Sequence, residues 1–254
     1  MSSPIRIVVP IDDSDPDALG VPLGYAKAMA KQRAKKGGHV VLLTHTKQQL
    51  RSTSLATHLG VSASKALGAN KPVGIGDGLE LHHETMQTLR YGANGAIIIA
   101  FYADDKMLDF IDGLSGVSGV IAVPWLEDGA KVWTERWTPH VHGQTQQPPT
   151  EILSDPIVEN ALKSLSRISN LSHGVMHPRD KEYANETLRI LWAKGHSASP
   201  SDIKSWAIRE GWKPKAADEL AKLSAKIFAL KSKPSLAKYH DPHGRYERWK
   251  SSNE

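Results

Sequence analysis

Residues 5–17 read IRIVVPIDDSDPD, an apolar run that ends in four aspartates within six residues. The β-branched run at 5–11, bounded by turn residues, predicts a buried strand. A helix is expected over 18–36, where Ala, Leu and Met recur every three or four residues and a Gly-Gly pair follows. HVVLLT (39–44) predicts a second strand. Strand, helix and strand with continuous apolar runs form a βαβ unit, so this segment predicts a parallel sheet.

The chain up to residue 140 continues in the same manner. Residues 47–78 are rich in Ser, Thr, Gly and Ala, and we expect short helices and loops there, with a short strand near 72–75. The later patterns predict a helix over 79–91, a strand over 95–101, a helix over 104–114, a strand over 119–125 and an edge strand over 130–137. Together these elements predict a Rossmann-like α/β domain over 1–140, with a mostly parallel sheet.

A polar stretch then separates this domain from a helical one. GQTQQPPT (143–150) has two prolines and no periodicity, so we interpret 141–154 as a linker. Residues 155–235 predict a small all-α domain of three or four helices. The signals for these helices are Asp155-Pro156, the periodic run 179–194, a capping box at Ser199 that leads to Gly211, and Pro214. Trp192, Trp206 and Trp212 are expected in its core.

Composition limits the chemistry. The chain has no cysteine, which excludes disulfides, thiolate zinc sites and cysteine nucleophiles. Twelve histidines remain, and the pairs His140/His142 and His173/His177 each offer half of a metal site, although solvated loop histidines are commoner. No apolar run reaches the roughly 18 residues of a membrane span. No signal peptide precedes the first strand, so we expect a cytoplasmic protein without membrane contact.

Charge is distributed unevenly along the chain. Residues 1–150 carry fourteen basic and fourteen acidic side chains, whereas residues 151–254 carry eighteen and thirteen, so the second part supplies the whole net charge of +5. A basic helical domain is compatible with nucleic-acid or protein partners.

The first domain resembles the universal stress protein family. VVPIDDSD and HVVLLTHT, within 7–46, and GAIIIAF with GVIAVPW, within 95–125, occupy the places of that family's strands. The resemblance covers 5–125 and implies a Rossmann-like fold, with Asp12 and Ser14 at the positions of the family's aspartate and serine. FYADDKMLDFIDG stands where ATP-binding members carry a glycine-rich phosphate loop, and its acids disfavour a phosphate there. No family is recognised from the sequence of the helical domain.

Polar side chains follow two predicted strands. Asp12, Asp13 and Ser14 come after the first strand, and Asp104 comes after the strand at 95–101. Open parallel sheets bind ligands beyond the carboxyl ends of their strands. These four residues are therefore the candidate ligand-binding residues, and a nucleotide is one candidate ligand.

The same acids support two other interpretations. Asp12, Asp104 and Asp105 could hold Mg²⁺, which prefers oxygen ligands. Alternatively, acids near the start of a helix cap free N–H groups and suit the helix dipole. The capping role fits Asp15 and Asp17 best, and the role of Asp12 stays open between a ligand and a cap.

Other motifs carry less chemistry. GIGDG (74–78) precedes a predicted helix, but a flexible turn is the better interpretation. HHET (82–85) lacks the second histidine of a zinc protease motif, since Gln87 occupies that position. No G-x-S-x-G motif is present.

Two basic regions are candidate partner-binding surfaces. Lys213 and Lys215 lie where two helices could form a helix-turn-helix, although acids interleave with the lysines of the second helix, as on a solvated face. The tail 236–254 is basic and aromatic. Its candidate contact residues, which could stack on bases or dock the tail on the domain, are Arg245, Tyr246, Arg248 and Trp249.

Three functional hypotheses follow. The first is an α/β domain that senses a small ligand or nucleotide, coupled to a helical domain that binds nucleic acid or protein. The second is a Mg²⁺-dependent enzyme acting on a nucleotide or phosphoester through the strand-end aspartates. The third is an oligomeric scaffold whose interface holds exposed tryptophans at 133 and 137.

Overall fold

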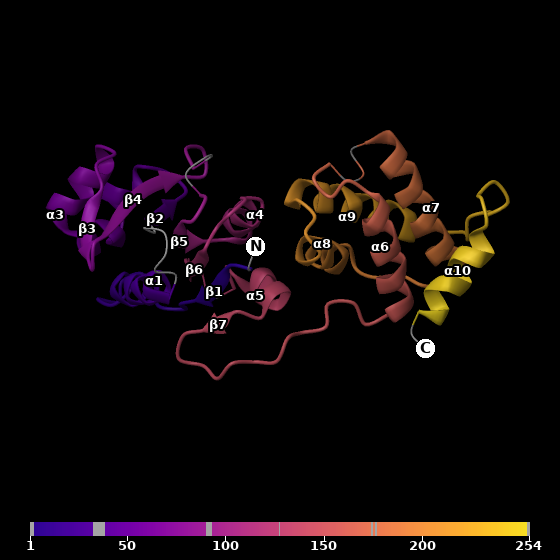
Figure 1. Cartoon of the computed structure of the whole chain (residues 1–254), viewed down its shortest axis with the longest axis horizontal. Helices are drawn as coiled ribbons and strands as arrows, with labels where there is room; N and C mark the ends of the chain where they lie inside the picture. Colours follow the sequence, from indigo (N-terminus) through magenta and orange to yellow (C-terminus); the bar gives the residue numbers. More distant parts are fainter. Residues whose placement is uncertain are drawn as a thin grey trace. The chain divides into compact units, whose positions relative to one another are not determined.

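The chain folds into two compact units, Met1–Pro149 and Thr150–Glu254. The structure is a computed structural model that describes residues 3–32, 39–89, 93–126, 128–173, 175 and 177–252. The first unit holds every strand of these residues and the second is helical (Figure 1). The division falls inside the stretch expected as a linker.

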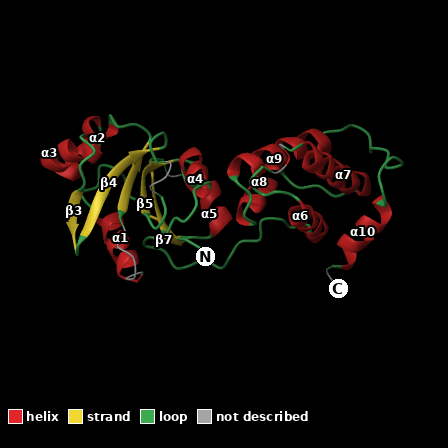
Figure 2. Ribbon diagram, turned by 45° about the horizontal axis from the view of Figure 1, so that its top comes forward, coloured by secondary structure: helices red, strands yellow, loops and turns green. Residues whose placement is uncertain are grey.

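The first unit is built on a seven-stranded sheet with the order β3-β4-β2-β5-β6-β1-β7. Only β3 is antiparallel to its neighbour, and the other pairs are parallel, which confirms the predicted mostly parallel sheet. Figure 2 shows the strands as one twisted sheet with helices around it. The strands are β1 Ile5–Val8, β2 Val40–Thr44, β3 Val73–Gly76, β4 Leu79–Thr85, β5 Ile97–Ala103, β6 Gly119–Pro124 and β7 His140–Val141.

Both faces of the sheet are covered by helices. Successive strand residues point to opposite faces, so Leu42 and Ile99 join one hydrophobic core while Leu43 and Ile98 join the other. Burial on both faces explains why the strands are continuously apolar. The helices are α1 Gly20–Gln32, α2 Gln49–Ser52 and α3 Ser54–Gly68, which contribute to the first core, and α4 Asp105–Asp112 and α5 Lys131–Trp137, which contribute to the second.

The connections that follow the neighbouring strands β2 and β5 lead toward opposite edges of the sheet. After β2, α2 and α3 cover one face and lead toward β3 and β4. After β5, α4 covers the opposite face and leads to β6. Because the two connections diverge, a crevice is expected between the carboxyl ends of these strands, where α/β sheets bind ligands.

Two predicted elements were wrong. The helix expected over 79–91 is the strand β4, because Leu81, His83 and Thr85 alternate with more exposed residues in a period of two. The edge strand expected over 130–137 is the helix α5, in which Trp133 and Arg136, three apart, are both buried. Residues 33–36 and 90–91 of the predicted helices lie outside the described residues.

The second unit packs helices around a tryptophan-rich core. Trp206 and Trp212 are at most 2 % exposed, as expected, and Trp192 is half-buried. Every helix carries proline in its first turn, where the missing N–H costs nothing. The helices are α6 Pro156–Ile168, α7 Pro178–Lys194, α8 Pro200–Arg209, α9 Pro214–Phe228 and α10 Pro242–Ser251. No helix of the described ranges is long and apolar enough to cross a bilayer.

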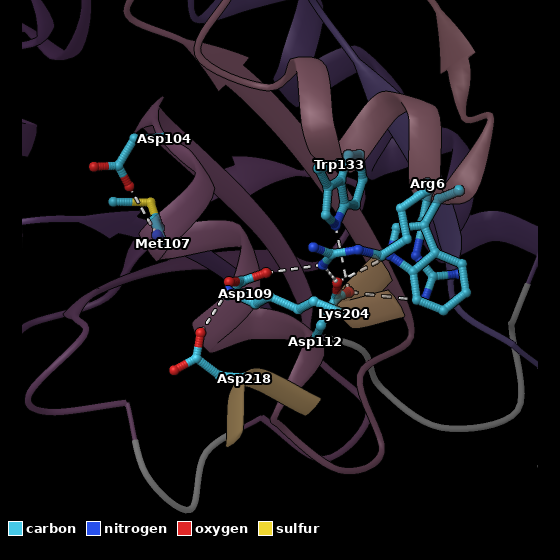
Figure 3. Close-up of polar contacts among 10 residues, drawn as sticks. Arg6, Asp104, Met107, Asp109, Asp112, Trp133, Lys204 and Asp218 are labelled. Carbon is cyan, nitrogen blue, oxygen red and sulfur yellow. Dashed lines mark hydrogen bonds and ion pairs between the residues drawn. The ribbon is translucent and has the colours of Figure 1, made fainter. Parts of the chain in front are cut away.

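A buried ionic cluster joins α4 and α5 (Figure 3). Arg136 is 2 % exposed, and its Nη1 donates to Asp109 Oδ1 and to Asp112 Oδ2, each at 2.8 Å. Arg6 of β1 approaches Asp112 at 3.9 Å, and burial lowers the pKa of Arg6 to about 10. Burial also raises the pKa of Asp112, although the tryptophan and arginine neighbours act in the opposite direction. Through Arg6, the cluster also joins both helices to β1.

Tryptophans complete this cluster, which corrects the expectation that Trp133 and Trp137 are exposed. Trp133 is 1 % exposed and donates its Nε1–H to Asp112, and Trp137 is half-buried and donates to the same carboxylate at 2.9 Å. The guanidinium of Arg6 lies 3.4 Å from the centroid of the Trp137 ring. The sequence predicted these side chains to be exposed because it placed them on an edge strand, whereas α5 turns them inward.

Candidate functional site

A pocket of about 450 Å³ lies at the carboxyl ends of β2, β5 and β6, at the reversal point of the sheet. Its wall is largely apolar, with a few polar groups, which is the usual composition of small-molecule sites. The residues that define it are His45, Gln49, Tyr102, Asp104, Trp125 and Leu126. We call it the apolar pocket.

Tyr102 shapes the apolar pocket through an unusual backbone conformation. Its φ of 63° lies in the left-handed region, and the pairing of β5 with β6 shifts between Phe101 and Ala103. The Tyr102 carbonyl accepts a hydrogen bond from Nε2 of His45 at 3.0 Å, while its hydroxyl pairs with Ser54 Oγ at 2.9 Å. Such strain in a non-glycine residue is concentrated at functional sites.

The outer rim of the apolar pocket exposes large apolar side chains. Trp125 is 64 % exposed and Leu126 is 70 % exposed, although both follow a fully buried strand. The Trp125 ring lies 5.6 Å from the Tyr102 ring between centroids. At Gly129 the rim approaches β5 so closely that a Cβ would lie 2.9 Å from the Ala103 carbonyl oxygen, so only glycine fits there. The rim is therefore held close to β5 and presents a flat indole to solvent.

A second pocket of about 570 Å³ lies beside the first, at the ends of β2 and β4. The two share His45 and Thr46. Its remaining wall is polar and includes Lys47, Asn70, His83, Glu84, Thr85 and Thr88. We call it the polar pocket.

His83 is the most buried imidazole of the polar pocket, at 8 % exposure. Its Nε2 lies 2.8 Å from Thr44 Oγ1, and that hydroxyl donates its own proton to the Thr46 carbonyl. Nε2 must therefore be the donor, which leaves Nδ1 as the acceptor of a neutral ring. Burial, and secondarily the charge of Lys47, lower the pKa of His83 to about 4. The ring is neutral at pH 7.

This lowered pKa predicts a dependence of stability on pH. A histidine whose pKa is depressed on folding stabilises the protein above its unfolded pKa of about 6.5, and this contribution is lost as the pH falls toward about 4. Allowing for partial solvent screening, we expect a loss on the order of 1–2 kcal/mol over that window. Urea unfolding of wild type and His83→Gln at pH 7 and pH 4.5 measures it. An identical pH dependence in both proteins would contradict the prediction.

The predicted strand-end residues are only partly brought together. Asp104 lines the apolar pocket, where its Oδ2 lies 3.8 Å from Nε2 of His45, and its Oδ1 caps α4 by accepting from Met107 N. Figure 3 shows this cap. Asp13 accepts from Ser54 Oγ, which also bonds the Tyr102 hydroxyl, so it supports the pocket from behind.

Asp12 and Ser14 form a local turn. Asp12 Oδ1 accepts from the backbone N–H and the hydroxyl of Ser14, at 2.8 and 2.6 Å, and the hydroxyl bond is the main reason that the pKa of Asp12 is lowered. In the described part of the chain, no three His, Asp or Glu side chains are grouped so as to hold a metal ion. The predicted metal set of Asp12, Asp104 and Asp105 is therefore not assembled, because one member turns back on Ser14 and another caps a helix.

Several residues of the two pockets were missed by sequence reasoning. His45 follows β2 as Asp104 follows β5, so the rule on strand ends could have identified it. Trp125 follows β6 in the same way. His83 and Thr85 were hidden because their segment was predicted to be helical.

The GIGDG segment and one histidine pair have structural roles. Asp77 and Gly78 both have positive φ, at 56° and 71°, and form the tight turn between β3 and β4, as the turn interpretation predicted. His140 Nε2 and His142 Nδ1 both approach the Tyr25 hydroxyl, at 3.3 and 3.0 Å. This hydroxyl ties the last edge strand to α1.

The basic tail is mostly used inside the helical unit. Arg245 is 7 % exposed and donates to Glu186 and to Thr187, and Trp249 is 4 % exposed with its carbonyl bonded to Asn160. These two side chains dock α10 and cannot stack on bases, which corrects their assignment as contact residues. Tyr246 is half-buried, and its hydroxyl lies 3.0 Å from Nε2 of His196.

The remaining predicted contact residues differ in exposure. Arg248 is exposed and pairs with Asp241, Lys215 is exposed, and Lys213 is half-buried at the start of α9. Lys222 of α9 pairs with two acids of the same helix, as on a solvated face. The surface of α9 therefore lacks the uninterrupted basic character of a phosphate-binding stripe.

Comparison with known proteins informs only the helical unit. Residues 154–250 match the family model of a domain of unknown function, DUF1889. This match contains α6 to α9 and all but the last residue of α10, and it spans less than half of the chain. No curated protein matches the chain. The family match does not extend to the α/β unit, so its resemblance to universal stress proteins remains a prediction.

Proposed function

We propose that the α/β unit binds a small molecule in the apolar pocket and the adjoining polar pocket. The observation that carries this proposal is the position of the apolar pocket, between β2 and β5 where the sheet reverses its connections. Ligand sites in open α/β sheets occur at this point because the diverging loops leave a crevice there.

Three further features support the proposal. The pocket combines an apolar wall with a few polar groups. A backbone strained at Tyr102 supplies the carbonyl that orients His45. The large apolar side chains Trp125 and Leu126 stay exposed at the rim, where a ligand would remove them from water.

Alternative functions receive less support. The Mg²⁺-dependent enzyme needs a group of acids that the described residues do not assemble. The oligomeric scaffold needs exposed tryptophans in α5, and these are at least half-buried. Nucleic-acid binding by the helical unit stays a prediction, and it now rests on Lys213, Lys215, Tyr246 and Arg248 without Arg245 and Trp249.

The test uses an uncharged aromatic probe whose fluorescence rises in apolar surroundings, N-phenyl-1-naphthylamine. We expect saturable binding to the full chain and at least about tenfold weaker binding to Trp125→Ala, because a well-packed aromatic contact contributes more than about 1.4 kcal/mol. Val61→Ser is the matched control, since Val61 is 87 % exposed in the same unit but lines neither pocket. Equal affinity of Trp125→Ala and wild type would refute the proposal.

A further inference from the structure

The two pockets adjoin each other along the carboxyl edge of the sheet. They share His45 and Thr46, and together they extend from the end of β4 across β2 and β5 to β6. Neighbouring strands lie about 4.8 Å apart, so three strand spacings give a length of roughly 14 Å. One molecule with two chemically different ends can therefore occupy both.

The polar pocket offers hydrogen bonds in both directions. The ammonium of Lys47, held at 3.0 Å by Asn70 Oδ1, is a donor, and the Glu84 carboxylate is an acceptor. Nδ1 of the neutral His83 ring is a further acceptor, and the hydroxyls of Thr85 and Thr88 can act either way. A ligand hydroxyl matches such a wall, because it donates one hydrogen bond and accepts others.

Charge disfavours an anionic ligand. Among the described residues that line the polar pocket, the charge of Lys47 is balanced by that of Glu84. The apolar pocket adds the negative charge of Asp104 at the junction, 3.8 Å from His45. A phosphate or carboxylate placed here would meet no excess of positive charge.

We propose that the molecule bound along this edge is an uncharged glycoside, with its planar or apolar aglycone against Trp125 and its sugar hydroxyls in the polar pocket. This inference rests on the proposed function, since it names the ligand class of the same site. The exposed indole suits a planar ring, which stacks on an aromatic face. The paired donors and acceptors suit vicinal hydroxyls.

Two matched probe series test the inference by calorimetry on the full chain. The first compares uracil, uridine and uridine 5′-monophosphate, and the second compares 4-methoxyphenol with 4-methoxyphenyl β-D-glucoside. We expect the glycoside of at least one series to bind about tenfold or more tightly than its bare aglycone. Uridine is expected to bind at least as tightly as its monophosphate. Which series responds distinguishes a nucleoside from an aryl glycoside.

Substitutions of exposed or half-exposed side chains test the preference for a glycoside separately from the existence of the ligand pocket, and they do not disturb the fold. Lys47→Met and Glu84→Gln should reduce the preference for the glycoside to about threefold or less, while binding of the bare aglycone is unchanged. Lys31→Met, whose side chain is exposed and pairs with Asp77, is the control and should leave the preference intact.

The outcomes are distinguishable. A bare aglycone that binds as tightly as its glycoside, or a monophosphate that binds more tightly than uridine, would overturn the glycoside inference and leave the ligand pocket standing. Binding of no probe in either series, or binding unaffected by Trp125→Ala, would overturn both.

Discussion

Arg136→Ala is expected to lower the unfolding free energy of the α/β unit by about 3–5 kcal/mol. Arg136 is 2 % exposed and neutralises Asp109 and Asp112 through two hydrogen bonds of 2.8 Å. Removing the guanidinium would leave the Asp112 carboxylate, also 2 % exposed, with the N–H groups of Trp133 and Trp137 and with Arg6 at 3.9 Å, but without its charged hydrogen-bond donor. An uncompensated buried charge costs far more than the loss of the pair itself.

Hydrogen exchange of peptides from β1, β5 and β6 in urea measures this loss within the α/β unit alone. Lys31→Ala, which breaks the exposed pair with Asp77, should change the unfolding free energy by less than about 1 kcal/mol. A loss for Arg136→Ala no greater than that of Lys31→Ala would show that the cluster does not anchor α4 and α5.

Trp249→Ala is expected to destabilise the helical unit by about 3–5 kcal/mol and to release α10. Trp249 is 4 % exposed, and the Arg245 guanidinium lies 5.5 Å from the centroid of its ring. Arg245 in turn lies over the Tyr183 ring and donates to Glu186. Loss of the indole therefore opens a cavity beside a buried charge, and both effects act in the same direction.

The change is measured by amide exchange of residues 242–251 and of α6 in the full chain. In Trp249→Ala, the amides of α10 should exchange at rates close to those of an isolated peptide. Lys250→Ala, at the exposed neighbouring position, should leave protection unchanged. Retained protection of α10 in Trp249→Ala would mean that the helix is held by Arg245 and Tyr246 alone.

The sequence predicted the sheet well where hydrophobic pattern and burial coincide. β2, β5 and β6 are runs buried on both faces along their whole length, and β1 is buried at Ile7 and Val8; such apolar runs identify central parallel strands. The first four helices of the helical unit were also predicted, and proline marks the start of three of them. The fifth, α10, was missed, because residues 236–254 were expected to be a tail. In both cases the local signal and the tertiary environment agree.

The errors arose where one pattern fits two structures. LELHHET has apolar or buried residues two apart, but its histidines and glutamates also suit a helix, and only pairing with β2 decides for a strand. In α5, Trp133 and Arg136 are both buried, and a buried arginine cannot be foreseen from sequence. Its partners Asp109 and Asp112 come from α4 and are brought close only by the tertiary fold.

The position of the candidate pocket follows from the sequence better than its lining does. The rule that ligands lie beyond the carboxyl ends of strands points to Asp104 and also applies to His45, and both line the apolar pocket. It could not show that Asp12 would be bound by Ser14, which is a matter of local turn geometry. Nor could it show the left-handed conformation of Tyr102, which shapes the pocket.

The most direct test of the ligand site is a map of backbone-amide NMR shifts during titration of the full chain with uridine and with 4-methoxyphenyl β-D-glucoside. We expect shifts to concentrate at the residues that line the two pockets, which fall within 45–49, 83–88, 102–104 and 125–126 and include Gly129. They should be small at the ionic cluster of Arg6, Asp112 and Arg136. Shifts that avoid the carboxyl edge, or saturating binding elsewhere on the chain, would contradict this expectation.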